Sequence, residues 1–378
     1  MWARYNRAYD AAHLARIKKQ TEDGDYDLRD YEVWWRDRQQ LLESRGFSLP
    51  TRLRPGWIPS WTGTDLNPYF CEDSFRSLNL KTTYVTRTSD GAAVMLKKTE
   101  ANTEESRIAQ LFSTPERLKD SRNHCVPILD HFPDQTDPKI EIIAMPLLRR
   151  CDDPPFYFVD EVLDFVLQTL EGLVFMHEQG VAHRDCTGTN VMMDGNLLFP
   201  NGFHPLQQMS DPINLRLLQP LRRSDVSSVK YYFIDFGLST YFEDNDTPRL
   251  VLGDVAQDHD VPELSCTVPY DPFPVDVFTL GNMYKKDFID KHPSLEFLLP
   301  LAGAMTRQKP DERPSAHNAL ALFKKLLAQQ RGYRKRWRLR GPRERTQQRI
   351  IEDLSCIRRE VWYIAKALLS KAHWRNRL

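Results

Sequence analysis

The chain has 378 residues, of which 41% are apolar and 11% aromatic, which is enough for one large two-lobed domain or two ordinary domains and excludes a wholly disordered chain. Lys plus Arg and Asp plus Glu both number 52, so the formal charge of zero gives no global attraction to nucleic acid or to a membrane. The six cysteines form no CxxC pair, which argues against a disulfide framework and indicates a reducing compartment.

The amino terminus has mixed charges and lacks the apolar core of a signal peptide. No apolar run approaches the roughly 20 residues that span a bilayer, so no transmembrane segment is predicted. We therefore expect an intracellular protein, in the cytoplasm or the nucleus.

Residues 1–70 predict a leader that precedes the main domain. A helix is expected in the run that ends at Gly46, on an apolar face made by Tyr31, Trp34, Trp35, Leu41 and Leu42. The segment 52–61 holds two prolines and two tryptophans, a composition typical of an extended segment laid across another surface. Buried packing is favoured there over a peptide-binding aromatic patch.

The main domain is predicted to cover residues 71–330 and to be α+β. Residues 75–148 alternate short β-rich runs with one helical stretch, and Ser89-Asp90-Gly91 predicts a turn between two of these runs. This pattern predicts a small sheet with one helix. From 149 to 330 the pattern becomes mostly helical, beginning with an apolar face of period 3.6 from residue 159 onward. Residues 195–230 break every periodicity and are expected to form a surface insertion.

Two motifs in the helical part carry polar side chains in a distinctive order. His183-Arg184-Asp185 is followed five residues after the aspartate by Asn190, and Asp235-Phe236-Gly237 follows a strand-like run. This order resembles that of protein kinases, and the resemblance implies that Asp185 is the carboxylate beside the attacking hydroxyl in phosphoryl transfer. It also implies that Asn190 and Asp235 are oxygen ligands for Mg²⁺. One such motif alone is weak, whereas the ordered pair is much more specific.

These motifs resemble those of protein kinases, and further matches follow in the same order. Val94-Met95-Leu96-Lys97 looks like the strand whose lysine holds the nucleotide phosphates. Glu105 is the expected partner of Lys97, with neighbouring Glu104 as the alternative. Met145 and Leu147 fall where a kinase hinge would contact adenine. The resemblance thus implies a bilobal kinase-like fold, with a sheet-plus-helix lobe, a larger helical lobe and Mg·ATP as cofactor.

Three structural matches extend the resemblance over about residues 75–327. Val261-Pro262-Glu263 resembles the end of an activation segment, Asp276 the buried aspartate of a central helix, and Arg313 the arginine that pairs with that glutamate. We therefore expect a buried Glu263–Arg313 ion pair. The Trp-rich leader, the insertion and this segment also resemble a group of kinase-like proteins of mushroom-forming fungi.

The chain departs from the kinase pattern at three places. No glycine-rich loop precedes Gly91, Thr187 stands where a lysine is usual, and the segment before Glu263 lacks the usual Gly-Thr pair. Two functions therefore remain open. The favoured one is phosphoryl transfer from ATP to a protein hydroxyl, Ser or Thr rather than Tyr; the alternative is a pseudokinase that acts as an ATP-binding or scaffolding module. A small-molecule phosphotransferase is a weaker third reading, and no zinc site is expected.

Residues 331–378 are strongly basic, with fifteen Lys or Arg against four Asp or Glu. A stripe of apolar residues at spacings of four and three predicts an amphipathic helix; its members are Ile350, Leu354, Ile357, Val361, Ile364 and Leu368. Docking of this helix on the protein's own domain is the first expectation. An acidic partner, an anionic membrane and nucleic acid are alternatives, although no clear nucleic-acid signal is present.

Overall fold

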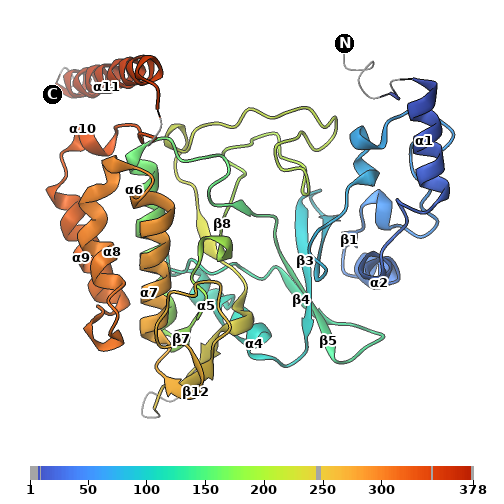
Figure 1. Ribbon diagram of the computed structural model, residues 1–378, viewed down its shortest axis with the longest axis horizontal. Helices are drawn as coiled ribbons and strands as arrows, with labels where there is room; N and C mark the ends of the chain where they lie inside the picture. Colours follow the sequence, from blue (N-terminus) through green and yellow to red (C-terminus); the bar gives the residue numbers. More distant parts are fainter. Residues whose placement is uncertain (1–6, 9, 244–247, 342–343, 376–378) are drawn as a thin grey trace. The chain divides into compact units, whose positions relative to one another are not determined.

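The computed structural model describes residues 7–8, 10–243, 248–341 and 344–375, without the side chains of residue 348 and residues 362–375. The chain is α+β: an antiparallel, curled sheet is followed by a more helical carboxy-terminal region (Figure 1). It divides into two compact units. Unit 1 comprises residues 1–113, 126–148 and 199–220, and unit 2 comprises residues 114–125, 149–198 and 221–378.

Unit 1 is built on a five-stranded sheet in which every neighbouring pair is antiparallel. In spatial order the strands are β1 (Phe47–Ser48), β2 (Thr82–Arg87), β3 (Ala93–Glu100), β5 (Ile140–Pro146) and β4 (Asp130–Pro133). The turn expected between β2 and β3 is present: Asp90 accepts the Ala92 N–H at 3.1 Å, and Gly91 has a φ of 73°, which favours glycine. One helix, α4 (Glu104–Phe112), follows β3.

The single helix expected in the leader is two short helices, α2 (Asp30–Arg36) and α3 (Gln39–Ser44). The break at Arg38 has a physical cause, because its guanidinium turns to the Asp134 carboxylate at 2.7 Å and to the Trp34 carbonyl at 3.0 Å. The expected apolar face nevertheless packs inward. Its buried members, Trp35, Leu41 and Leu42, share one core with β2, β3, β4 and β5.

The segment 52–61 packs as expected rather than forming an exposed aromatic patch. Trp61 is buried, and the Trp57 indole N–H donates to the Asp73 carboxylate at 2.9 Å. Arg52 is also buried and pairs with Glu32 at 2.6 Å. Helix α1 (Ala11–Glu22) joins this region through Ile17, which contacts Trp61 in a small core.

Within the described residues, the sheet lacks a tight hairpin at the edge where β1 pairs with β2, in keeping with the absence of a glycine-rich loop from the sequence. The edge strand β1 comes from residues 47–48, and the chain returns as β2 only at residue 82. A connection of this length replaces the tight hairpin that glycines would otherwise form.

Unit 2 is built around α6 (Val159–Glu178), which begins where the helical period was predicted to begin. Glu161 starts this helix by accepting the backbone N–H groups of Tyr157 and Phe158 at 2.7 and 3.2 Å. The predicted apolar face is buried throughout and consists of Val162, Phe165, Val166, Thr169, Leu170, Leu173 and Met176. Helix α9 (Ala316–Gln329) packs on α6, and α8 (Leu299–Met305) packs on both α9 and α7 (Phe273–Met283).

Short strands and helices complete unit 2. The helices are α5 (Pro115–Leu118), α10 (Gly332–Lys335), α11 (Thr346–Arg375) and a π-helical turn at Tyr284–Ile289 that continues α7. One small sheet has the order β6 (Arg149–Arg150), β8 (Val191–Met193) and β9 (Tyr231–Phe233). Two strand pairs are β7 (Val181–Ala182) with β10 (Thr240–Tyr241), and β11 (Val251–Gly253) with β12 (Ser265–Tyr270). None of the helices in the described ranges combines the length and apolarity that a membrane crossing requires.

Residues 195–230 are more than a surface insertion. Leu198, Phe199, Phe203 and His204 are all buried. The His204 ring accepts the Gln207 N–H at 2.9 Å, and so it fixes the loop around itself. An apolar anchor with a buried imidazole explains how a segment without periodicity remains ordered.

The carboxy-terminal helix α11 is present, but the described part of its apolar stripe does not pack on the rest of unit 2. Ile350, Leu354, Ile357 and Val361 are all exposed. The opposite, polar face contacts unit 2 instead, because its acids meet arginines there. The side chains of the two remaining stripe residues, Ile364 and Leu368, lie outside the described residues.

Candidate functional site

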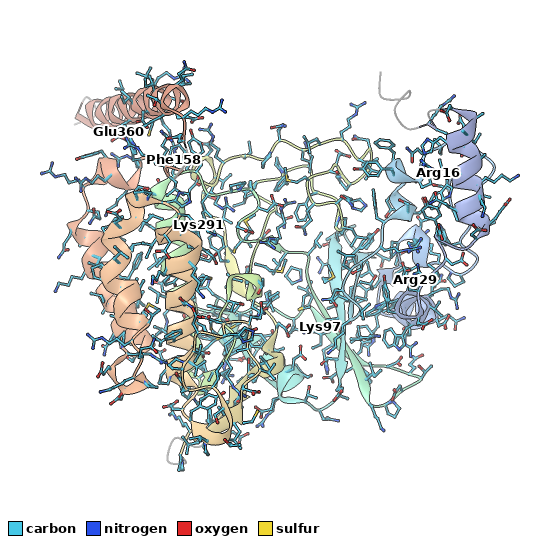
Figure 2. All side chains as sticks on the ribbon, viewed as in Figure 1. Arg16, Arg29, Lys97, Phe158, Lys291 and Glu360 are labelled. Atoms are coloured by element: carbon cyan, nitrogen blue, oxygen red, sulfur yellow. The ribbon has the colours of Figure 1, made fainter. Side chains whose placement is uncertain are left out.

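Within unit 1, strand β3 and helix α4 bring together the lysine and glutamate singled out in the sequence. The Lys97 ammonium pairs with the Glu105 carboxylate, and both side chains are about 15% exposed. The second oxygen of Glu105 accepts the Thr99 hydroxyl at 3.0 Å. The expected contact is therefore present, made by Glu105 of the two neighbouring acids. The ammonium of Lys97, a residue labelled in Figure 2, is thus held beside the sheet by a fixed partner.

Within unit 2, the segment from His183 to Asn190 holds Asp185 in a buried position. The Asp185 carboxylate accepts the Asn190 side-chain amide at 2.7 Å. Asp276 of α7 is fully buried and accepts the backbone N–H groups of His183 and Arg184 at 2.7 and 2.5 Å. The charge of Asp276 thus fixes the backbone that presents Asp185.

A glutamine that sequence reasoning missed also contacts Asp185. Gln257 donates its side-chain amide to one carboxylate oxygen at 2.8 Å and its backbone N–H to the other at 3.2 Å. The Thr189 hydroxyl donates to the side-chain carbonyl oxygen of Gln257, and the Thr187 and Thr189 hydroxyl oxygens lie 2.9 Å apart. Gln257 thus occupies the stretch that lacks the usual Gly-Thr pair. No local pattern marks it, because its partner is 72 residues away.

The backbones of Asn190 and Asp235 lie close together at one end of the β8–β9 pair. Strands β8 and β9 pair Val191 with Phe233, and the next residue pair is joined by the Ile234 N–H donating to the Asn190 carbonyl at 2.9 Å. Asp235 follows at once, exposed, with an unusual positive φ of 63°. Its carboxylate accepts the Gly237 N–H at 3.4 Å.

These residues suit a hard divalent cation. Because the Asn190 amide nitrogen donates to Asp185, its amide oxygen is the atom it can offer to a metal. An amide oxygen and an exposed carboxylate are ligands that Mg²⁺ accepts, alongside water and phosphate oxygens. No cluster of three or more His, Cys, Asp or Glu side chains suited to a metal occurs in the described ranges.

The predicted Glu263–Arg313 ion pair is confirmed. Two guanidinium nitrogens of Arg313 donate to the two carboxylate oxygens of Glu263, one of them (Nη2 to Oε2) at 2.8 Å. The Arg313 side chain is fully buried. Arg313 also donates to the backbone carbonyls of Arg307 and Pro274 at 2.7 and 2.9 Å. The guanidinium is thus fully used within unit 2.

Arg184 contacts both strands of the β11–β12 pair. Its guanidinium donates to the Leu252 carbonyl and to the Tyr270 hydroxyl, both at 3.0 Å. The Tyr270 hydroxyl in turn donates to the Gly253 carbonyl at 2.7 Å. These hydrogen bonds tie the β11–β12 pair to the segment that carries Asp185.

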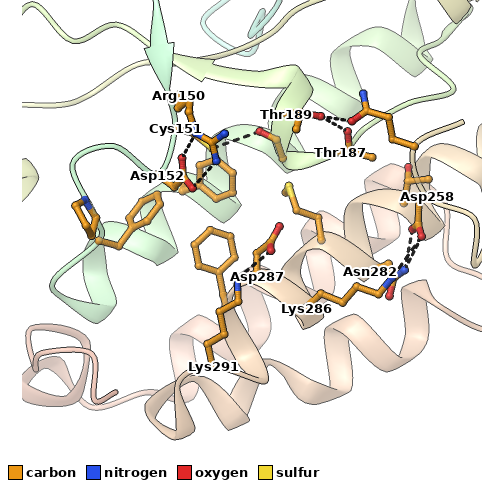
Figure 3. Close-up of a pocket in the computed structure, with 18 of the residues that line it drawn as sticks. Arg150, Cys151, Asp152, Thr187, Thr189, Asp258, Asn282, Lys286, Asp287 and Lys291 are labelled. Carbon is orange, nitrogen blue, oxygen red and sulfur yellow. Dashed lines mark hydrogen bonds and ion pairs between the residues drawn. The ribbon is translucent and has the colours of Figure 1, made fainter. Parts of the chain in front are cut away.

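A cavity of 620 Å³ opens in unit 2 beside the loop that follows Asp185 (Figure 3). Thr187, Gly188 and Thr189 line one side, and the π-helical turn supplies Lys286 and Asp287 on another. Phe156, Phe165 and Phe288 give it aromatic walls, and its remaining charged groups include Arg150, Asp152, Asp258 and Lys291. The cavity is large enough for an organic group or a peptide side chain.

Met145, Leu147 and Cys186 lie on or beside regular elements or in the interior of their units. Met145 lies on β5 opposite Met95, and Leu147 follows directly after this strand, half-buried, in unit 1. Cys186 is completely buried, and burial raises the pKa of its thiol well above the ordinary value. A thiol kept neutral in this way is a poor nucleophile, and its complete burial indicates a packing role.

No protein-family model matches the chain. A stretch of 42 residues is 45% identical to a light-sensor protein kinase of Ceratodon purpureus. This match covers 11% of the chain and 3% of that protein. It indicates a kinase-like relation of limited extent.

Proposed function

We propose that the protein transfers the γ-phosphoryl group of ATP to a hydroxyl of a protein substrate, Ser or Thr rather than Tyr. The observation that carries the proposal is the buried Asp185, oriented by Asn190 at 2.7 Å on a segment whose backbone is fixed by Asp276. A carboxylate with a fixed position is what a general base for a hydroxyl requires. The Lys97–Glu105 pair of unit 1 supports the same reading.

Each group then has a separate role. Lys97 binds the nucleotide phosphates, and Glu105 positions its ammonium. The backbone groups of Met145 and Leu147 would contact the adenine. Asn190 and Asp235 would hold Mg²⁺, which neutralises phosphate charge when bound. Asp185 orients the substrate hydroxyl and receives its proton.

The Gln257 contact adds a condition to this mechanism. Both Asp185 oxygens accept hydrogen bonds from Gln257, one of them from its side chain. A substrate hydroxyl must therefore share Asp185 with Gln257 or displace its side-chain amide. The neutral chain of Thr187, Thr189 and Gln257 stands where a lysine would have supplied positive charge, so we expect slower turnover than a lysine would give.

In this proposal the cavity beside Thr187–Thr189 receives a side chain of the protein substrate. Its aromatic walls and charged rim lie next to the loop that carries Asp185. They suit a side chain that neighbours the acceptor residue of an extended peptide.

The test compares three variants supplied with high Mg·ATP, labelled in the γ-phosphate, and scored for phosphorylation of the protein itself and of generic proteins. Asp235→Asn should weaken Mg²⁺-dependent nucleotide binding. Asp185→Asn should leave that binding nearly intact and lower turnover by about 10²-fold or more. Asp311→Asn, an exposed aspartate in unit 2, is the matched control and should change neither quantity.

The alternative reading is a pseudokinase that binds nucleotide or acts as a scaffold. It is favoured if the wild-type protein binds Mg·ATP, labels no protein, and Asp185→Asn changes nothing measurable. Because β1 and β2 are not joined by a glycine-rich hairpin, weak nucleotide binding alone decides nothing.

A further inference from the structure

The carboxy-terminal helix α11 segregates its charges in an unusual way. Each of the four acids in residues 331–378 contacts a basic or hydroxyl side chain of unit 2. Glu360 meets the Arg336 guanidinium, whose Nε lies at 2.8 Å, and Asp353 meets Arg338 at 2.7 Å. Glu344 pairs with the same arginine at 2.9 Å, and Glu352 accepts the Tyr157 hydroxyl.

These contacts fix which face of α11 points toward unit 2. Arg338 is 2% exposed, Cys356 is 5% exposed, and the Arg359 guanidinium lies 3.8 Å from the centre of the Phe158 ring. Phe158 and Glu360 are both labelled in this region in Figure 2. The chain before α11 is also held, because the Leu339 N–H donates to the Tyr157 carbonyl at 2.8 Å.

The opposite face is therefore fixed outward, and it is aliphatic. Five large side chains stand exposed on it over three turns of helix; they are Ile350 (55%), Ile351 (68%), Leu354 (60%), Ile357 (48%) and Val361 (61%). Isolated exposed apolar residues are normal on a protein surface, whereas a contiguous row on one helix face marks an interaction site.

The charge beside this row is positive. Arg345 and Arg358 are exposed, and so is Arg349, whose guanidinium lies 3.9 Å from the Asp353 carboxylate. The acids are turned toward the rest of unit 2. The segment 331–378 keeps fifteen basic residues against those four acids. An aliphatic row flanked by arginines and free of outward acids matches the interfacial zone of a bilayer that contains anionic lipid.

We propose that α11 binds the surface of an anionic membrane, with its aliphatic face in the headgroup boundary and its arginines on lipid phosphates. A second copy of the helix is disfavoured, because it would bring rows of like charge together. Nucleic acid would satisfy the arginines but would leave the five aliphatic side chains in water. This proposal is independent of any phosphotransferase activity.

The experiment measures co-sedimentation of the full-length protein with vesicles of phosphatidylcholine alone and of phosphatidylcholine with 30% phosphatidylserine. Binding should require the anionic lipid and should weaken as salt is raised. Leu354→Ser with Ile357→Ser should lower the vesicle affinity by about tenfold or more, because apolar burial is lost. Arg358→Glu should lower the affinity for anionic vesicles and leave the unfolding temperature of the protein unchanged.

The matched control is Leu78→Ser with Ile213→Ser, which removes two exposed aliphatic side chains of unit 1 (98% and 90% exposed) and should leave vesicle binding unchanged. The unfolding temperature of every variant is measured to show that the fold is intact. Three outcomes would overturn the proposal: no binding to anionic vesicles, equal binding to neutral vesicles, or binding unaffected by Leu354→Ser with Ile357→Ser. Concentration-dependent self-association abolished by that double variant, without vesicle binding, would instead assign the face to a second copy.

Discussion

At the scale of single residues, two aspartates with buried carboxylate oxygens differ in how well hydrogen bonds satisfy them. Asp276, with no exposed surface, is satisfied by backbone N–H groups and by the His177 ring at 3.0 Å. Asp160, in the first turn of α6, is less well placed. One of its oxygens is buried and finds no hydrogen-bond partner among the described residues.

Burial raises the pKa of the Asp160 carboxyl to about 6, with a further contribution from neighbouring Glu161, while Arg359 opposes the shift. The folded state therefore holds a proton that the unfolded chain releases near pH 4. The contribution of Asp160 to the free energy of unfolding is fully present below about pH 4 and is lost as the pH rises to about 6. Above about pH 6 this contribution does not change further.

We therefore expect Asp160→Asn to stabilise the protein at pH 7 and to have little effect at pH 4. The gain at pH 7 should be roughly 1–2 kcal/mol, below the full linkage value because Asp160 is only partly buried. Denaturant unfolding across this pH range measures the difference. Asp160→Glu keeps a titrating group and should keep the slope, and equal pH profiles for Asp160→Asn and wild type would contradict this account.

At the scale of elements, close packing between helices decides where glycine is required. Gly281 of α7 faces α8, and a Cβ added there would lie 2.5 Å from the Cβ of Met305. Gly303 of α8 has nothing within 4 Å of such an atom. The two glycines have the same helical backbone and different surroundings.

Gly281→Ala should accordingly destabilise the protein by about 1–3 kcal/mol, because α7 and α8 must move apart. Gly303→Ala should be neutral or stabilising by up to about 1 kcal/mol, because alanine favours the helix. Thermal unfolding of the two variants measures the contrast. Equal effects of both substitutions would show that α7 and α8 do not pack as described.

At the scale of the whole molecule, each unit has its own buried core. In unit 1 the leader belongs to that core, since Trp35 is 1% exposed and packs with Val85, Leu96 and Ile142 of the sheet. In unit 2 the buried face of α6 packs against α9, whose Phe323 side chain is buried. Units that each bury their own side chains can open in separate steps.

Trp35→Ala should cost about 3–5 kcal/mol through the cavity that it leaves. Hydrogen exchange should show lost protection in β2, β3 and β5, with α6 and α9 retaining wild-type protection. Leu78→Ala, in the same unit but 98% exposed, should change nothing. If protection in α6 falls as much as in β3, the units unfold as one, and the description of separate cores is wrong.

Sequence patterns determined the elements that depend on local periodicity. The 3.6-residue period from residue 159 predicts α6 with its buried face, and the Ser-Asp-Gly turn predicts the β2–β3 hairpin. The Glu263–Arg313 pair could also be predicted, because its two residues carry motif positions. Of the candidate site, the contact of Lys97 with Glu105 was predicted in the same way.

Only the tertiary structure decided the features that join distant residues. The edge strand β1 comes from the leader, and Gln257 reaches Asp185 across 72 residues, with no local signal for either contact. The stripe on α11 was visible in the sequence, but its direction was not. Ion pairs formed by the acids of the opposite face hold that face toward unit 2, so the aliphatic row points outward. A periodic pattern determines that a helix has two faces, whereas the partners that pack against it determine which one is buried.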